Sequence, residues 1–310
     1  MNRIISTLES GLSDKALSML KDMNEYLTIK QASSIANIAI RLNDGHVLKW
    51  LITDSILRFD LKINYMNAFL DACKMNFLEI VKVLISLNVV DPSCGNNKAL
   101  CDASENGFYE LVKILLNDER VCPVAREGYP LRIAIKNNHT KIVKHLLSMK
   151  NVDPSEFNDA LFDLAERYSR TKIMKLLLSD KRLNPCKHKN GLIRHACEWG
   201  TANIVKVLLS DERIDPSIID ANSNGLISLA TKDGRTETVK LLLSDERTDP
   251  SKDKNAIKFA TIFFRVNILK ILFQDRRVNT KAESNPDIQE LLALNSTSIE
   301  EILRDAGAQF

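Results

Sequence analysis

One stretch of the chain, IVKVLLSDERIDPS from Ile204 to Ser217, recurs with small changes along most of the sequence. Two markers keep the copies in register: a lysine in the middle of each copy, and an alanine ten residues before it. The lysines are Lys49, Lys82, Lys113, Lys144, Lys175, Lys206, Lys240 and Lys270, and the alanines are Ala39, Ala72, Ala103, Ala134, Ala165, Ala196, Ala230 and Ala260. Their spacing of about 31 residues predicts a solenoid, in which one supersecondary unit stacks on the next.

Each unit is predicted to contain two helices and a turn, and residues 97–123 show this pattern most clearly. Leu100 and Ala103 belong to the first helix, which ends at Gly107. Apolar residues then recur over 111–116 at positions i, i+1, i+4 and i+5, which gives the second helix one buried stripe. The alanine is expected where two helices approach closely, because its side chain is a single carbon.

The residue four positions after each alanine is expected to end the first helix. Gly and Asn dominate there, and both tolerate the left-handed conformation with which helices commonly terminate. The residues are Asn43, Asn76, Gly107, Asn138, Ser169, Gly200, Gly234 and Phe264. Phe264 departs from this pattern in the last unit, where a repeat is expected to be atypical.

Two short elements follow the second helix of most units. Charged tips of the type Asp-Glu-Arg occupy 118–120, 180–182, 211–213, 245–247 and 275–277. Asp-Pro-Ser occupies 91–93, 153–155, 215–217 and 249–251. Proline fixes its own φ and disfavours helix in the residue before it. Both elements are therefore interpreted as solvated turns that lead to the next unit, rather than as metal or catalytic sites.

The ends of the chain are predicted to be helical caps that cover the repeat array. Residues 1–33 form the N-terminal cap, with Ser13 as a helix cap, and Thr28 with Gln31 has the capping-box spacing that opens the first repeat helix. The repeat array covers 34–282. Residues 283–310 form the C-terminal cap, where Pro286 suits the first turn of a helix.

Composition and charge exclude several classes of partner. The formal net charge is +3 with both signs interleaved in every unit, so no stripe suited to nucleic acid is expected. No apolar run approaches the roughly 18 residues that a membrane span needs. The six cysteines show no CxxC spacing, which favours reduced structural thiols. We expect a cytoplasmic protein, with the nucleus as the alternative.

Motifs for catalysis are absent from the sequence. It contains no Gly-rich phosphate loop, HExxH, GxSxG or paired Cys/His spacing. A packing role is favoured over catalysis for His139, and His195 with Cys197 makes no recognisable metal set. We therefore predict no catalytic, cofactor-binding or metal-binding residue and no enzyme.

The unit resembles the ankyrin repeat, in which a TPLHxAAxxGHxEVVKLLL core forms two antiparallel helices followed by a hairpin or loop. The best copy is GYPLRIA at 128–134, followed by His139 and Ile142-Val143-Lys144. The resemblance implies an all-α, ankyrin-type solenoid of about eight helix-turn-helix units. Only Pro130 keeps the family proline, residues such as Cys101 and Arg132 replace its histidine, and turns are expected in place of hairpins. The LLLSDERxDPS ending resembles ankyrin proteins of large DNA viruses.

A solenoid presents a long concave surface built from its first helices and turn tips. By analogy with ankyrin proteins, the groove residues flank the recurrent alanine. The predicted partner-binding residues are Arg167, Tyr168, Arg170, His195, Glu198, Trp199 and Lys232. Tyr168 and Trp199 share one position in adjacent units, and aromatic and arginine side chains most often anchor interfaces. The alternative is that both rings pack over the next unit.

The function predicted from these features is a non-enzymatic scaffold, acting as a monomer, that binds a protein partner. One alternative is an adaptor that recruits substrates to host ubiquitin ligase machinery, as viral ankyrin proteins with an added F-box do. Residues 283–310 are short for an F-box, and residues 1–33 lack its Leu-Pro opening. The other alternative is a virion or assembly component. The sequence does not name the partner, because unrelated specificities share one framework.

Overall fold

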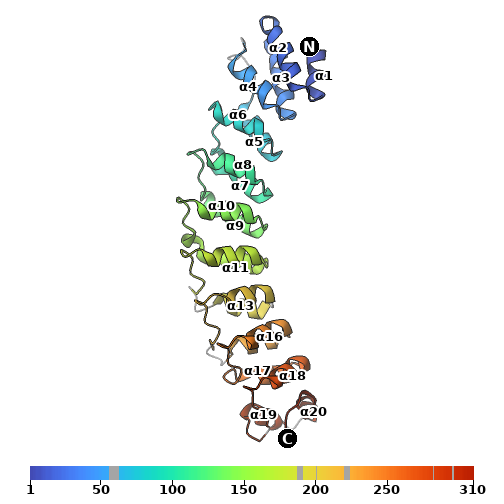
Figure 1. The fold of residues 1–310 in the computed structure, drawn as a ribbon, viewed down its shortest axis with the longest axis vertical. Helices are drawn as coiled ribbons and strands as arrows, with labels where there is room; N and C mark the ends of the chain where they lie inside the picture. The colour runs from blue at the N-terminus through green and yellow to red at the C-terminus, as the bar shows by residue number, and fades with distance from the viewer. Residues whose placement is uncertain (56–62, 187–190, 200, 220–223, 282, 295–296) are drawn as a thin grey trace. The chain divides into compact units, whose positions relative to one another are not determined.

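The computed structural model describes residues 1–55, 63–186, 191–199, 201–219, 224–281, 283–294 and 297–310. These residues form two compact units, Met1–Val152 and Asp153–Phe310. Both units are built from helices (Figure 1). In the described part of the chain the β pairing is limited to an isolated bridge between Lys281 and Gln309. The predicted all-α fold class is therefore confirmed.

The first unit begins with α1 (Asn2–Glu9), α2 (Ser13–Asp22) and the 3-10 turn η1 (Asn24–Tyr26). Four helix pairs follow: α3 (Ile29–Arg41) with α4 (Gly45–Thr53), α5 (Tyr65–Lys74) with α6 (Leu78–Ser86), α7 (Cys94–Asn106) with α8 (Tyr109–Leu116), and α9 (Ala125–Lys136) with α10 (Thr140–Ser148). First helices pack against first helices and second against second. The pairs therefore stack in the order of the sequence (Figure 1).

The second unit repeats this arrangement after a short 3-10 helix, η2 (Pro154–Phe157). Its pairs are α11 (Asn158–Arg167) with α12 (Thr171–Ser179), α13 (Gly191–Trp199) with α14 (Ala202–Leu209), α15 (Leu226–Lys232) with α16 (Thr236–Ser244), and α17 (Asn255–Ile262) with α18 (Val266–Gln274). Then α19 (Pro286–Leu292) packs on α17, and α20 (Thr297–Ala306) packs on α17 and α18. The described residues thus contain the eight predicted helix pairs.

The recurrent residues build the core. Each of the eight alanines lies in a first helix and is at most 1% exposed. In the copied stretch, Ile204, Val205 and Leu208 are fully buried. Removing such a side chain from water stabilises the fold by roughly 1.5–3 kcal/mol. The close approach predicted at the alanines and the buried stripe predicted on the second helices are both present.

The first helices end as predicted. Seven of the eight residues four positions after the alanines have φ between 52° and 78°, and the eighth, Gly200, lies outside the described residues. Gly107 has a second reason to be glycine, because an added Cβ would lie 2.5 Å from the ring of His139. Phe264 adopts the same conformation with φ at 56°, although its side chain is bulky and 68% exposed.

One of the helix starts that were predicted near the ends of the chain is wrong. Thr28 and Gln31 form the predicted capping box at the start of α3, and Pro286 opens α19 after the capping residue Asn285. Ser13 does not cap: Leu12 is the N-cap of α2, and the Ser13 hydroxyl lies buried without a hydrogen-bond partner. The sequence also gave no indication of α1. The division at residues 33 and 283 stays a prediction.

The charged tips are turns, but they also bind neighbouring helix pairs together. The Arg213 guanidinium holds both oxygens of Asp211, at 2.9 and 2.6 Å. The same guanidinium donates to the carbonyls of Leu183, at 3.0 Å, and Leu178, at 2.7 Å, in the preceding pair. We call this arrangement the Asp-Arg clasp. It satisfies carbonyl groups at a helix end that otherwise lack a donor.

The clasp recurs with the repeat. Arg247 reaches the carbonyls of Ile214 and Leu209, and Arg277 reaches those of Thr248 and Leu243, both at 2.6–3.0 Å. In the first unit, Arg120 reaches the Val90 carbonyl at 3.2 Å. The interpretation of the tips as solvated turns was therefore incomplete, because it missed a link that runs from one helix pair to the one before it.

Removing one clasp should destabilise the second unit. Arg213→Ala removes the guanidinium donor of two carbonyls and leaves Asp211 only the backbone N–H of residue 213, and we expect a loss of about 1 kcal/mol, since the guanidinium is partly exposed. Arg213→Lys should cost nearly as much, because an ammonium cannot bind both oxygens and both carbonyls. Urea unfolding measures the change. Glu212→Ala, an exposed neighbour, is the control, and equal stability of all four proteins would contradict the role of the clasp.

The clasps should also make stability depend on pH. Hydrogen bonds from the arginine hold the pKa of Asp118, Asp180, Asp211, Asp245 and Asp275 below the ordinary value. A carboxyl with a depressed folded pKa stabilises the fold above its unfolded pKa, near 3.9, and this contribution disappears as pH falls through the folded value. Unfolding midpoints should therefore drop steeply below about pH 4. Asp211→Asn should drop less over the same range, and an equal drop would contradict this account.

Phe264 is expected to be strained. The left-handed conformation costs an L-residue roughly 1–2 kcal/mol, and glycine avoids this cost. Phe264→Gly should therefore raise the free energy of unfolding by about 1 kcal/mol, less the entropy that glycine gains in the unfolded chain. Phe263→Gly is the matched control, because Phe263 has φ at −92° and should lose stability. Thermal unfolding separates the two, and parallel losses would argue against strain.

Candidate functional site

The predicted binding residues gather where the first helices of the second unit end. Arg167 is the last residue of α11, Trp199 the last of α13 and Lys232 the last of α15. The helices α11, α13 and α15 pack side by side in this order. Arg167, His195 and Lys232 are exposed, and Glu198 is half-buried. The structure therefore brings the predicted residues onto one face of three consecutive helix pairs.

The two aromatic residues at the shared position differ in their surroundings. Tyr168 is half-buried, and the Arg170 guanidinium lies 5.8 Å from its ring centroid. Trp199 is 70% exposed. In the next helix pair, the residue that corresponds to Arg170 is Thr201. Its side chain is too short to cover an indole. Of the two alternatives, packing over the next unit does not apply to Trp199.

Two hollows flank Trp199. The first, of about 530 Å³, lies between α11 and α13 and is open to solvent. Its lining residues are Asp163, Glu166, Arg167, His195, Trp199 and Thr201. The second, of about 490 Å³, lies towards α15. Its lining residues are Glu198, Trp199, Leu229, Lys232, Asp233, Arg235 and Arg265. Each hollow contains two carboxylates, but the first adds Arg167 and His195 whereas the second adds Lys232, Arg235 and Arg265. Tyr168 and Arg170 line neither.

Glu166 is the most unusual residue of the first hollow, because it is a carboxylate only 8% exposed. Burial raises its pKa, and the neighbouring His195 charge partly opposes this. One carboxylate oxygen accepts a long hydrogen bond of 3.5 Å from the Thr201 hydroxyl. The described residues provide no arginine or lysine within ion-pair distance of it.

Sequence reasoning missed Glu166 and the other polar residues that complete the hollows. A signal was present, because the residue directly after the recurrent alanine is uncharged in every other unit. These residues are Ile40, Cys73, Ser104, Ile135, Cys197, Thr231 and Thr261. A glutamate at a position that otherwise belongs to the core indicates a local function or a local cost in stability.

His139, in contrast, has the structural role that was predicted for it. Its Nε2 lies 2.9 Å from the carbonyl oxygen of Glu105, in the preceding helix pair. Asn137 donates to the same oxygen at 2.8 Å. In the second unit Arg265 occupies the register of His139 and donates to the Lys232 carbonyl at 3.3 Å. These side chains fill the space between successive first helices.

Comparison with known proteins agrees with this architecture. A family model described as "Ankyrin repeats (3 copies)" matches residues 36–126, 131–220 and 192–283. The chain belongs to the ankyrin repeat family. No curated protein sequence matches it.

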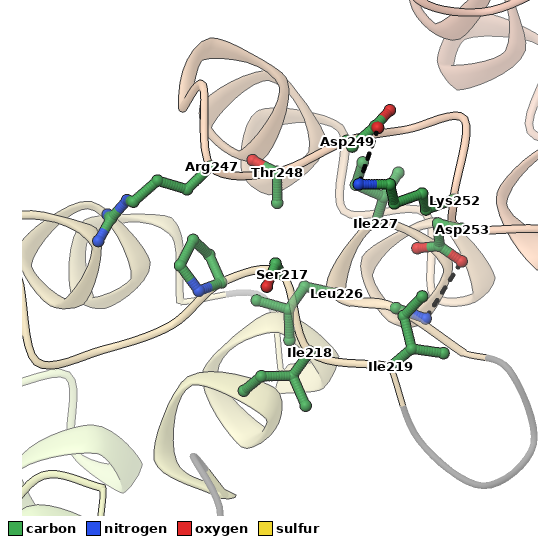
Figure 2. Close-up of a pocket in the computed structure, with 12 residues that line it drawn as sticks. Ser217, Ile218, Ile219, Leu226, Ile227, Arg247, Thr248, Asp249, Lys252 and Asp253 are labelled. Atoms are coloured by element: carbon green, nitrogen blue, oxygen red, sulfur yellow. Dashed lines mark hydrogen bonds and ion pairs between the residues drawn. The ribbon is translucent and has the colours of Figure 1, made fainter.

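A third cavity of this ankyrin chain is structural (Figure 2). Asp253, in the loop before α17, is 4% exposed and accepts hydrogen bonds from the backbone N–H groups of Gly225, at 3.1 Å, and Ser228, at 2.7 Å. Burial raises the pKa of Asp253, while these bonds oppose the rise. The cavity beside it has a volume of about 40 Å³, room for about three waters. The aspartate thus ties one ankyrin unit to the next.

Two thiols of this ankyrin protein, Cys73 and Cys197, are buried in its core. Burial raises the pKa of Cys73 to about 12 and that of Cys197 further, so neither thiol is a nucleophile at neutral pH. Among the described residues no group of three or more His, Cys, Asp or Glu side chains could hold a metal ion. In the same residues no helix is long and apolar enough to cross a membrane.

Proposed function

We propose that the chain acts as a monomeric, cytoplasmic scaffold whose protein partner is held at the ends of α11, α13 and α15. Ankyrin repeats are generally protein-interaction modules, and the family supplies the framework of this proposal. The binding residues proposed are Arg167, Tyr168, Arg170, His195, Glu198, Trp199 and Lys232.

The exposure of Trp199 is the observation that supports this location. Tryptophan is over-represented among the residues that anchor interfaces, and here its ring is accessible to a partner. Charged side chains surround the indole on both sides, which gives an apolar centre with a polar rim. Tyr168 under Arg170 offers a second aromatic surface next to it.

The two alternative roles have less support. Ile288, Leu291 and Leu303 of α19 and α20 are buried, and these helices pack against α17 and α18. These three apolar side chains therefore serve the packing of the fold, which favours the scaffold over the adaptor. The likeness of the LLLSDERxDPS ending to viral ankyrin proteins extends the proposal to a host protein as partner. A virion component would instead be found in purified particles.

Replacing Trp199 tests the location. Trp199→Ala should weaken partner binding at least tenfold, because an anchoring residue contributes roughly 2 kcal/mol or more. Tyr168→Ala should weaken it less. The measurement is the amount of each protein retained by the immobilised chain from cell extract, followed by titration of the purified partner. Unchanged helical circular dichroism shows that the variants fold.

The chain contains a matched control for this experiment. Met75 occupies the position of Trp199 in the second helix pair of the first unit and is 66% exposed. Met75→Ala should leave partner binding unchanged. If Met75→Ala and Trp199→Ala behave alike, the proposed location is wrong.

A further inference from the structure

Glu166 is a charged residue at a position that is uncharged in the other helix pairs. It directly follows the recurrent Ala165, a register position that holds Thr231 and Thr261 in the last two helix pairs. Those threonines are buried at 0% and 1% exposure, so the position belongs to the core. Burying a carboxylate there without a charged partner costs stability, which a threonine would avoid. The fold alone therefore does not explain this glutamate.

A short side chain, Thr201, borders the space in front of Glu166. At the register of Thr201, other units carry His139 and Arg265, which reach back to a backbone carbonyl of the preceding first helix. Thr201 cannot span that distance, and its hydroxyl contacts the Glu166 carboxylate instead. The hollow thus has the location and the acceptors that a long basic side chain uses elsewhere in the protein.

The remaining walls of the hollow also suit a cation. Asp163 adds a second carboxylate, and neither acid has an ion-pair partner among the described residues. The exposed indole of Trp199 offers a π face of the kind on which guanidinium groups stack. Arg167 and His195 also line the hollow and lower the pKa of Glu166, so the two acids outweigh one permanent positive charge. The hollow on the other side of Trp199 has the opposite balance.

We infer that the hollow between α11 and α13 binds an arginine side chain of the protein partner. The guanidinium stacks on Trp199 and donates to Glu166, in the space that Arg265 fills in its own unit. Arginine fits better than lysine, because a planar guanidinium can stack and donate at the same time. This inference rests on the proposed function and specifies the chemistry that the partner presents.

The test uses N-acetyl-arginine amide as the probe, with the full chain. The chain contains two tryptophans, Trp50 and Trp199, so a 1H–15N spectrum shows two indole N–H signals. Trp50 lies in α4 and is 8% exposed, which makes it an internal reference in the same sample. The probe should shift the Trp199 signal in a saturable manner and leave that of Trp50 in place. N-acetyl-citrulline amide, which has the same shape without the charge, should shift neither.

Variants then separate the carboxylate from the surrounding surface. Glu166→Thr introduces the residue of the last two units, so it should fold with a raised melting temperature and weaken the probe at least about fivefold. Glu166→Gln should weaken it similarly. Asp233→Asn is the control, because Asp233 lies in the opposite hollow beside the same indole. It should leave the affinity unchanged.

Three outcomes would overturn the inference: no saturable shift of Trp199, equal shifts with citrulline or lysine amide, or full affinity in Glu166→Thr. If the arginine probe fails while Trp199→Ala still abolishes partner binding, the proposed function stands and only the arginine site is wrong. If Trp199→Ala does not weaken partner binding, the proposed function is wrong, and so is this inference.

Discussion

An aspartate and an arginine in the turn after five of the eight second helices link successive helix pairs. In a repeat protein, stability is approximately the sum of the stability of each unit and of its contacts with its neighbours. The clasp at Asp211 and Arg213 strengthens the second term, because one guanidinium closes its own turn and also binds two carbonyls of the pair before. The family histidine is mostly replaced in this chain, and the clasp supplies a different polar link between units.

This link separates the residues that build the stack from those that can vary. Within each of the two compact units, the copied apolar residues and the clasps determine how one helix pair packs on the next. The residue before each second helix varies more, and His139, Arg170 and Thr201 stand at this one register. Each choice changes the neighbouring surface: His139 fills it, Arg170 covers Tyr168, and Thr201 leaves Trp199 and Glu166 uncovered.

Sequence reasoning recovered the features that repeat with fixed local spacing. The period, the buried alanines and the left-handed residues after them depend on contacts within one helix pair or on backbone conformation. Such features appear in the sequence as residues at a fixed spacing. The clasp joins residues 29 to 38 positions apart, and nothing local distinguishes it from a solvated charge pair. The prediction for Ser13 was wrong because Ser13 is the first residue of α2 itself, and Leu12 takes the N-cap position. Trp199 was found by position, but its exposure depends on Thr201 two residues later.

The coincidence of two unusual features at one place is the strongest argument for function here. Trp199 exposes an indole, and Glu166 is a buried carboxylate with no ion-pair partner among the described residues. Other helix pairs show that the framework accepts other residues at both positions, such as Asn137 for the first and Thr231 for the second. At the register of Thr201, Arg265 places a guanidinium between two first helices, whereas Thr201 supplies no charge. A cation that arrives from outside the chain would contact the indole and the acid together, and this explains their joint presence better than the requirements of folding do.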